Sequence, residues 1–216
     1  MEPCDQPVLS VALFPLPDVV LFPCAILPLH IFEQRYRVMT AEALADQRLL
    51  AMALLKPGWE TDYDQAPAIE PVVCVGQILN FEKLPDGRYH LLLQGQARAR
   101  ILEETGVRPF RTARVEVFAP SAAEIDLVNQ RERLMELVRS LPQTAQRTQL
   151  HRIVASPLST SDVADLLAFN FVQDVASKQS LLAEKDVTRR ISRLIEILQA
   201  TWQPLLGRSV GGLHLN

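Results

Sequence analysis

One pentapeptide of the 216-residue chain has the spacing of a hydrolase nucleophile, because Gly207-Arg208-Ser209-Val210-Gly211 matches the pattern G-x-S-x-G. In such hydrolases the serine lies on a turn between a strand and a helix, and an acid and a histidine follow it along the chain. The residues after Gly211 include His214 but no Asp or Glu. The pattern therefore indicates a flexible, glycine-rich tail and not a catalytic serine.

The other residues that could do chemistry lack the spacing that catalysis or metal binding needs. The histidines are His30, His90, His151 and His214, and none belongs to an H-E-x-x-H motif. Glu103 and Glu104 directly follow the expected strand Ala97–Leu102, and adjacent residues in extended backbone point to opposite faces. No glycine precedes a lysine, so a phosphate-binding loop is absent. We expect no catalytic residue, no cofactor and no metal site.

The cysteines and the apolar runs indicate the cellular compartment of the protein. Cys4, Cys24 and Cys74 form no C-x-x-C pair, and an odd count does not favour a disulfide framework. Each lies in or beside an apolar run, where a free cysteine behaves as a small buried hydrophobe. The amino terminus lacks the basic flank of a signal peptide, and no apolar run approaches the ~18 residues of a membrane span. We expect a cytoplasmic protein without a membrane partner.

The charge of the chain argues against a nucleic-acid partner. The formal net charge is −3 and the isoelectric point is near 5.8. A protein that displaces counterions from phosphates carries a basic stripe, and neither half of this chain has one. With 48% hydrophobic and 22% charged residues, the composition is that of a folded globular protein.

Apolar segments separated by prolines and glycines predict strands in the first 118 residues. The expected strands are Val8–Phe14, short pieces within Val19–Leu29, Leu49–Leu55, Val72–Phe81, Tyr89–Leu93, Ala97–Leu102 and Ala113–Phe118. Proline lacks an amide donor, so Pro23 and Pro28 favour bends and edge strands. Gly76 suggests a bulge or a close backbone approach, and Asp86-Gly87 a tight hairpin. Such short strands with mixed pairing, interrupted by one helix within Ile31–Ala45, predict a small, partly closed β-barrel.

A helical periodicity replaces the strand pattern after Pro120. Ser121 and Glu124 form a capping box, and Ile125, Val128, Met135 and Val138 mark an apolar face. Further helices are expected at Thr148–Ala155, from Ser161, and at Ser177–Ala183. The last helix has Asp186 as N-cap, the apolar stripe Val187, Ile191, Leu194, Ile195 and Leu198, and the outward residues Arg189, Arg190, Arg193 and Glu196. We predict a β-rich subdomain at 1–118, a helical bundle at 119–203 and a tail at 204–216.

Several matched segments, taken together, point to a known family. They are Leu13–Met39 (LFPLPDVVLFPCAILPLHIFEQRYRVM), Val75-Gly76, Phe81–Tyr89, Gly95 with Arg98, Arg100 and Ile101, and Leu181-Leu182 with Asp186–Leu198. Over about residues 8–200 the chain resembles the amino-terminal, substrate-recognition domain of Lon-type ATP-dependent proteases. It departs at Cys24, where the family often has glycine, and at Gln34, where proline is frequent.

The resemblance implies an α+β fold: a PUA-like mixed β-barrel with one inserted helix, followed by an all-helical bundle. It also implies a function, since this domain recognises unfolded or tagged proteins in full-length Lon proteases. We expect the ATPase and Ser-Lys protease modules to be absent, because 216 residues are too few to hold them. We therefore expect a stand-alone, non-catalytic polypeptide-binding module, either an adaptor or an unfolded-protein recognition factor, with a polypeptide or a protease as its partner. The alternatives are a PUA-like RNA-binding protein and a hydrolase with an unrecognised site.

Five residues are candidates for polypeptide binding. Trp59 and Tyr63 lie in the polar loop after an expected strand, and Phe32, Arg35 and Tyr36 lie around the start of the inserted helix. Binding centres are enriched in Trp, Tyr and Arg. The structural alternative for Phe32 and Tyr36 is that they pack this helix onto the barrel. For Trp59 it is that the ring folds back onto its own domain.

Overall fold

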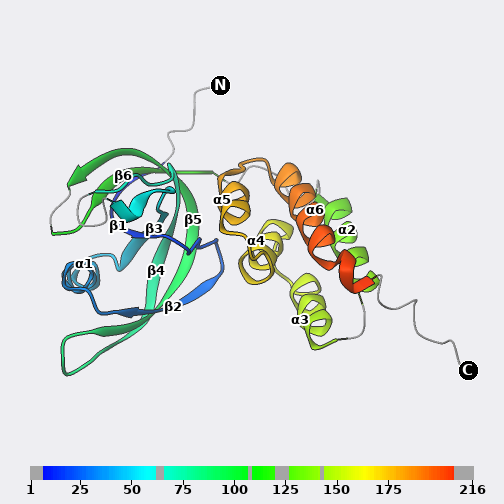
Figure 1. The fold of residues 1–216 in the computed structure, drawn as a ribbon, viewed down its shortest axis with the longest axis horizontal. Helices are drawn as coiled ribbons and strands as arrows, with labels where there is room; N and C mark the ends of the chain where they lie inside the picture. The colour runs from blue at the N-terminus through cyan, green and yellow to red at the C-terminus, as the bar shows by residue number, and fades with distance from the viewer. Residues whose placement is uncertain (1–6, 62–65, 107–108, 120–126, 142–143, 207–216) are drawn as a thin grey trace, which may run out of the picture. The chain divides into compact units, whose positions relative to one another are not determined.

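The computed structural model describes residues 7–61, 66–106, 109–119, 127–141 and 144–206. The elements, in chain order, are β1 (Val8–Leu16), β2 (Ile26–Ile31), α1 (Gln34–Ala45), β3 (Leu49–Leu54), the 3-10 turn η1 (Trp59–Thr61), β4 (Val72–Lys83), β5 (Tyr89–Gly106), β6 (Thr112–Val117), α2 (Val128–Ser140), α3 (Ala145–Val154), α4 (Thr160–Phe171), α5 (Val175–Ala183) and α6 (Val187–Leu206) (Figure 1).

Contacts divide the chain into two compact units. The barrel unit comprises Met1–Pro120 together with Asp174–Ala183, and the helical unit comprises Ser121–Gln173 with Glu184–Asn216. Helix α5 therefore groups with the strands, although it lies within the region 119–203 in which a helical bundle is expected. Among the described residues, no helix is both long and apolar enough to cross a membrane.

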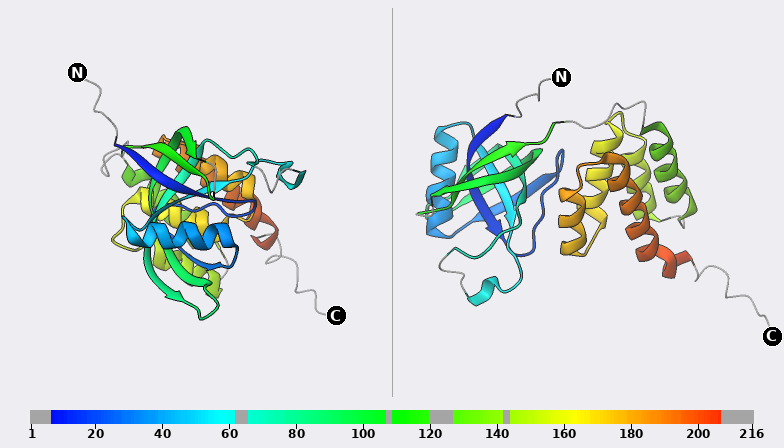
Figure 2. Two further views of the ribbon diagram at one scale, coloured as in Figure 1. Left: turned by 90° about the vertical axis from the view of Figure 1, so that its left-hand side faces the viewer. Right: turned by 90° about the horizontal axis from the view of Figure 1, so that it is seen from above.

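The six strands of the barrel unit form one mixed sheet in the order β2-β5-β4-β3-β1-β6. The pair β1–β3 is parallel and the other pairs are antiparallel. Strand β5 also pairs with β6, so the sheet curls and nearly closes into a ring (Figure 2). A mixed barrel with one inserted helix, α1, is the architecture that the sequence predicts.

The barrel core follows from the period of two along each strand. The buried side chains that share the interior are Val11, Leu13, Ala51, Ala53, Val73, Val75, Ala99, Ala113 and Val115. Alternate residues of a strand face the same side, which brings these positions together. Each buried Val or Leu contributes about 1.5–3 kcal/mol of transfer free energy before ordering entropy is subtracted. The expected bulge is present as a register shift between Val75 and Gly76.

Strand β2 is the edge strand at one end of the sheet order, and Pro28 lies in its middle opposite Leu92. The backbone of Gly95 donates to the carbonyl of Ala25 at 2.9 Å. Hydrogen-bonded and non-hydrogen-bonded pairs alternate along an antiparallel ladder. Counting from Ala25 and Gly95, Pro28 falls in a non-hydrogen-bonded pair, so its missing amide removes no bond to β5. The expected edge position of Pro28 is confirmed.

The turn that leads into β2 places Cys24 in an unusual backbone conformation. The amide of Ala25 donates to the carbonyl of Phe22 at 3.2 Å, so Pro23 and Cys24 occupy the central positions of a β-turn. Cys24 has φ of +63°, as the second central residue of a type II turn requires. Glycine reaches this conformation without steric cost, whereas a residue with a β-carbon does not.

We predict that Cys24→Gly stabilises the barrel unit by about 0.5–1 kcal/mol, because it removes the steric cost of positive φ. The measurement is urea unfolding followed by the fluorescence of Trp59 in a Trp202→Phe background, since these are the two tryptophans of the chain. Cys24→Ala is the matched control: it also removes the thiol but keeps the β-carbon, so it should bring no gain. A larger gain with alanine than with glycine would contradict the explanation.

Helix α1 is anchored to the barrel through one aromatic ring and one arginine. Tyr36 is buried, with its ring centroid 4.6 Å from that of Phe14. Arg37 donates through Nε to the carbonyl of Gly87 at 2.8 Å, in the expected hairpin turn between β4 and β5. Gly87 has φ of +82° there, in agreement with the hairpin prediction.

The last helix, α6, is capped and packed as predicted. The amide of Arg189 donates to Oδ1 of Asp186 at 3.0 Å, so Asp186 is the N-cap. The whole expected stripe is buried: Val187, Ile191, Leu194, Ile195 and Leu198. The apolar face predicted for α2 is wrong at Val128, which is 51% exposed, while Leu134 and Leu137 are buried.

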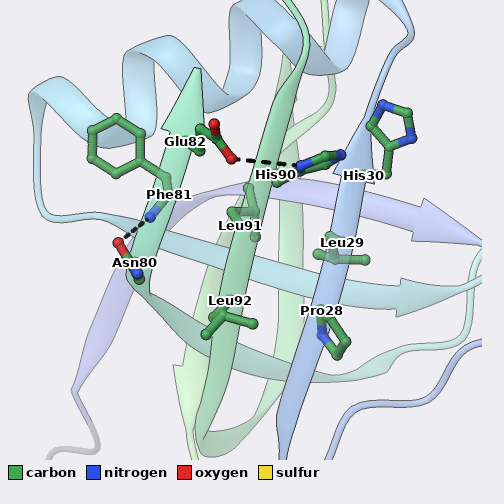
Figure 3. Close-up of a pocket in the computed structure, with 9 residues that line it drawn as sticks. All are labelled: Pro28, Leu29, His30, Asn80, Phe81, Glu82, His90, Leu91 and Leu92. Atoms are coloured by element: carbon green, nitrogen blue, oxygen red, sulfur yellow. Dashed lines mark hydrogen bonds and ion pairs between the residues drawn. The ribbon is translucent and has the colours of Figure 1, made fainter. Parts of the chain in front are cut away.

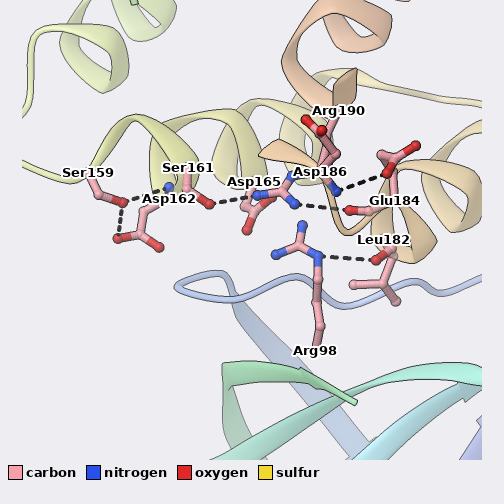
Figure 4. Close-up of polar contacts among 9 residues, drawn as sticks. All are labelled: Arg98, Ser159, Ser161, Asp162, Asp165, Leu182, Glu184, Asp186 and Arg190. Atoms are coloured by element: carbon pink, nitrogen blue, oxygen red, sulfur yellow. Dashed lines mark hydrogen bonds and ion pairs between the residues drawn. The ribbon is translucent and has the colours of Figure 1, made fainter. Parts of the chain in front are cut away.

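The prediction that Arg190 faces outward is also wrong. Its side chain is buried, and its Nε lies 3.3 Å from Oδ1 of Asp165, which is buried on α4 (Figure 4). That contact is an ion pair without hydrogen-bond geometry. Arg190 donates through Nη1 to the carbonyl of Glu184 at 3.0 Å and through Nη2 to Oγ of Ser161 at 2.6 Å. Arg190 is three residues from Val187 and four from Leu194, so helical geometry places it on the buried face.

Several features expected from the sequence lie outside the described residues. Besides the loop residue Tyr63, they include Cys4, the capping box of Ser121 and Glu124, Ile125 of the predicted apolar face, and the glycine-rich pentapeptide 207–211.

Candidate functional site

A groove in the barrel unit unites the segment around Trp59 with helix α5. Its volume is about 630 Å³. It is lined by Pro17, Leu54, Leu55, Pro57, Trp59, Glu70, Pro71, Val72, Asp174, Val175, Ala176, Gln179, Ser180 and Ala183. Most of these side chains are apolar, and a volume of this size is typical of a ligand pocket. We call this feature the Trp59 groove.

The strand side of the Trp59 groove is fixed by backbone hydrogen bonds. The amide of Leu55 donates to the carbonyl of Leu16 at 2.9 Å, and that of Glu70 donates to the carbonyl of Leu54 at 2.8 Å. Leu55 and Ile69 also form an isolated antiparallel bridge. These bonds hold the segments before and after η1 side by side, so this side of the groove is preformed.

The helical wall is attached to the barrel by two side chains. Gln179 of α5 donates through Nε2 to the carbonyl of Val72 at 2.9 Å. Arg98 of β5 is buried and donates through Nε to the carbonyl of Leu182 at 3.1 Å (Figure 4). Its guanidinium also lies 5.9 Å from the ring centroid of Phe22. Because both bonds end on backbone carbonyls, they fix the position of α5 itself and not only one side chain.

Asp174 begins the helical wall as the cap of α5. Its Oδ2 accepts from the amide of Ser177 at 2.7 Å. The hydrogen bonds from the side chain and the amide of Ser177 hold the pKa of Asp174 below its usual range. The carboxylate is therefore charged at neutral pH. Its capping contribution is present above the unfolded pKa and is lost as the pH falls through the lower folded value.

Trp59 is the aromatic residue of the groove. It begins the short turn η1 and is half-buried, and Thr61 donates through Oγ1 to the carbonyl of Gly58 at 3.0 Å across the turn. A half-buried indole on the rim of an apolar groove presents a large surface at low conformational cost. The second candidate of this loop, Tyr63, lies outside the described residues.

The other three candidates lie around α1 and do not line the Trp59 groove. Tyr36 is buried beneath the guanidinium of Arg35, which lies 4.6 Å from its ring centroid. Arg35 also pairs through Nε with Oε2 of Glu33 at 3.0 Å. Phe32, by contrast, is 62% exposed. Tyr36 thus packs the helix onto the barrel, as the structural alternative states, whereas Phe32 presents its ring on the surface.

A second, smaller hollow of about 390 Å³ lies over strands β2, β5 and β4. Figure 3 shows a row across these strands in which His90 stands between Glu82 and His30. Nδ1 of His90 is 3.8 Å from Oε2 of Glu82, and the two histidine rings are 4.8 Å apart at their centroids. The ring of Phe32 lies 6.0 Å from that of His30.

No cluster of three or more His, Cys, Asp or Glu side chains suited to a metal ion occurs in the described part of the chain. Of the two hollows, the Trp59 groove is larger and is lined mainly by apolar side chains. What this arrangement can do is enclose an apolar side chain of a ligand.

Sequence reasoning found Trp59 but missed the residues that α5 contributes to the groove. The signal for Asp174 was present, because an aspartate directly before a helical segment is a favoured N-cap. It would have moved the expected helix start from Ser177 to Val175, where α5 begins. Gln179 carries no such signal, since its partner Val72 is 107 residues away along the chain.

Comparisons with known proteins agree with this fold. A family model described as the ATP-dependent protease La (LON) substrate-binding domain matches residues 10–200. The chain is 32% identical over 195 residues to a Lon protease of Trichlorobacter lovleyi, covering 86% of this chain and 23% of that protein. It is 31% identical over 206 residues to Lon protease 2 of Bdellovibrio bacteriovorus, covering 88% and 24%. The chain thus spans about a quarter of the length of these relatives.

Two solved structures have the same fold. The chain superposes on the N-terminal domain of a Mycobacterium avium complex Lon protease with a TM-score of 0.65 and 21% identity, covering 88% of this chain and 98% of that one. For a Lon N-terminal domain protein from Xanthomonas campestris the TM-score is 0.62 and the identity 22%, covering 87% and 98%.

Proposed function

Because the chain belongs to the family of Lon substrate-binding domains, we propose that it binds polypeptide, and that the Trp59 groove receives an apolar side chain of the bound segment. Binding requires no catalytic residue in this region. We also propose that it acts as a recognition or adaptor module for unfolded proteins in the cytoplasm, alone or together with a protease.

The observation that carries the proposal is a half-buried tryptophan on a preformed apolar groove. Unfolded polypeptides differ from folded proteins in exposing apolar side chains, and a groove of about 630 Å³ accommodates a large one. Because backbone hydrogen bonds and Gln179 already fix both walls, little conformational entropy is lost when a segment binds.

The test is a fluorescence anisotropy titration of a labelled, permanently unfolded polypeptide with the full chain. We expect saturable binding that a folded control protein does not show. Trp59→Ala should weaken it by about tenfold or more, because truncating a central aromatic anchor costs roughly 2 kcal/mol. Thermal unfolding of the variant would establish that the barrel unit is intact.

Phe81→Ala is the matched control, because it removes an exposed aromatic ring of β4 that does not line the Trp59 groove. It should leave the affinity within about twofold of the wild type, below 0.5 kcal/mol. If Phe32→Ala abolished binding and Trp59→Ala did not, the surface around β2 and α1 would be the binding site. If the unfolded polypeptide did not bind at tens of micromolar, the proposed function itself would be rejected.

A further inference from the structure

Among the described residues that line the Trp59 groove, the charged side chains are all of one sign. Among its described lining residues are two carboxylates, Glu70 and Asp174, and no lysine, arginine or histidine. Lys56 and Lys178 are sequence neighbours of lining residues, but neither lines the groove. A ligand in the groove therefore meets apolar surface together with negative charge.

Both carboxylates are carried by backbone that is held in place. The amide of Glu70 is bonded to the carbonyl of Leu54, and Asp174 caps α5 through Ser177. Helix α5 is in turn bonded to the barrel through Gln179. The carboxylate of Asp174 is held at the exposed rim by Ser177, and Glu70 is half-buried, so both present negative charge to a ligand that occupies the groove.

We propose that the groove selects unfolded segments in which an aromatic or aliphatic residue is flanked, within a few positions, by lysine or arginine. This rests on the proposed function and specifies its substrate class. The apolar residue occupies the groove beside Trp59, and the neighbouring cation pairs with Glu70 or Asp174. Successive residues of an extended segment are about 3.3 Å apart, so a cation one to three positions away reaches the rim of the groove. Segments whose anchor is flanked by acidic residues are repelled.

The test uses labelled peptides of equal length with one phenylalanine and with lysine, glutamine or glutamate on both sides of it. The affinity should fall in the order lysine, glutamine, glutamate, by about three- to tenfold at each step, which corresponds to roughly 0.7–1.4 kcal/mol. Raising the salt from about 50 mM to about 500 mM should reduce the difference, because exposed charges are screened. A lysine-flanked peptide with alanine in place of phenylalanine should bind at least tenfold more weakly, about 1.4 kcal/mol.

The variant Glu70→Gln with Asp174→Asn removes both charges, and asparagine remains a good N-cap for α5. In this variant the lysine and glutamine peptides should bind within about twofold of each other. The double variant Glu42→Gln with Asp46→Asn is the control: it removes two exposed carboxylates of the α1 region and should keep the full preference. Circular dichroism would verify that both variants are folded.

The outcomes separate the two proposals. If lysine- and glutamate-flanked peptides bound equally well, or the glutamate peptide more tightly, the charge preference would be overturned while polypeptide binding stood. The same holds if the preference survived the loss of both groove carboxylates. If none of the peptides bound, the polypeptide-binding function would be rejected together with its specificity.

Discussion

Gly95→Ala is expected to destabilise the barrel unit by at least about 3 kcal/mol, at or above the upper end of the usual cost of overpacking. A β-carbon at this position would lie 2.0 Å from the carbonyl oxygen of Phe22 and 3.1 Å from Sγ of Cys74. The obstructing oxygen belongs to the backbone, so no change of side-chain rotamer relieves the contact. Gly95 also exchanges hydrogen bonds with Cys24 and Ala25, and moving it would break the start of the β2–β5 ladder.

Urea unfolding followed by Trp59 fluorescence, in a Trp202→Phe background, measures this loss. Gln96→Ala is the control, because it changes the neighbouring exposed residue and should alter stability by less than about 0.5 kcal/mol. If Gly95→Ala had the same unfolding midpoint as the control, the backbone at Phe22 would be able to move at little energetic cost, and the prediction would be wrong.

Asp165→Ala is expected to destabilise the helical unit by about 3–5 kcal/mol, because it leaves the charge of Arg190 buried without its carboxylate partner. The side chains of Arg190 and Asp165 are 4% and 2% exposed, so water cannot replace the lost partner. The hydrogen bonds that Arg190 donates to the carbonyl of Glu184 and to Oγ of Ser161 neutralise no charge.

A variant that replaces both members of the pair distinguishes the cost of breaking the pair from the net contribution of the pair to stability. Asp165→Leu combined with Arg190→Met should recover most of the stability that Asp165→Ala loses, since apolar replacement of a whole buried pair is often neutral. Unfolding is followed through Trp202, which is buried on α6, in a Trp59→Phe background. Glu132→Ala, an exposed change on α2, is the control. A loss below 1 kcal/mol for Asp165→Ala would falsify the assignment of a buried, charge-dependent pair.

The features predicted correctly from the sequence are those set by neighbouring residues. The turn at Asp86-Gly87, the bulge at Gly76 and the cap at Asp186 each depend on a few adjacent positions. The buried stripe of α6 follows from helical periodicity alone. Local chemistry was sufficient in these cases, because the tertiary structure does not oppose it.

The features that the sequence did not predict depend on partners far along the chain. The sequence near Arg190 indicates a surface residue, because its ion-pair partner Asp165 lies 25 positions earlier in the chain. The Trp59 groove is a similar case. The tryptophan is evident in the sequence of the loop, but the helical wall of the groove is attached through Gln179 to a strand more than 100 residues away. Cys24 is a different case. It occupies the positive-φ position of a turn, where glycine is the usual residue, so the sequence did not indicate this turn.

Residues 174–183 belong to the barrel unit but are synthesised after residues 121–173 of the helical unit, and this order affects folding during translation. A ribosome adds about 5–20 residues per second, so residues 121–183 require roughly 3–13 s after the last strand has been synthesised. Throughout that interval the nascent barrel lacks α5, and the apolar residues Leu54, Leu55 and Val72 have no helical wall beside them. The Trp59 groove is therefore completed late in translation, and a product that terminates between residues 120 and 174 would carry the strands without it.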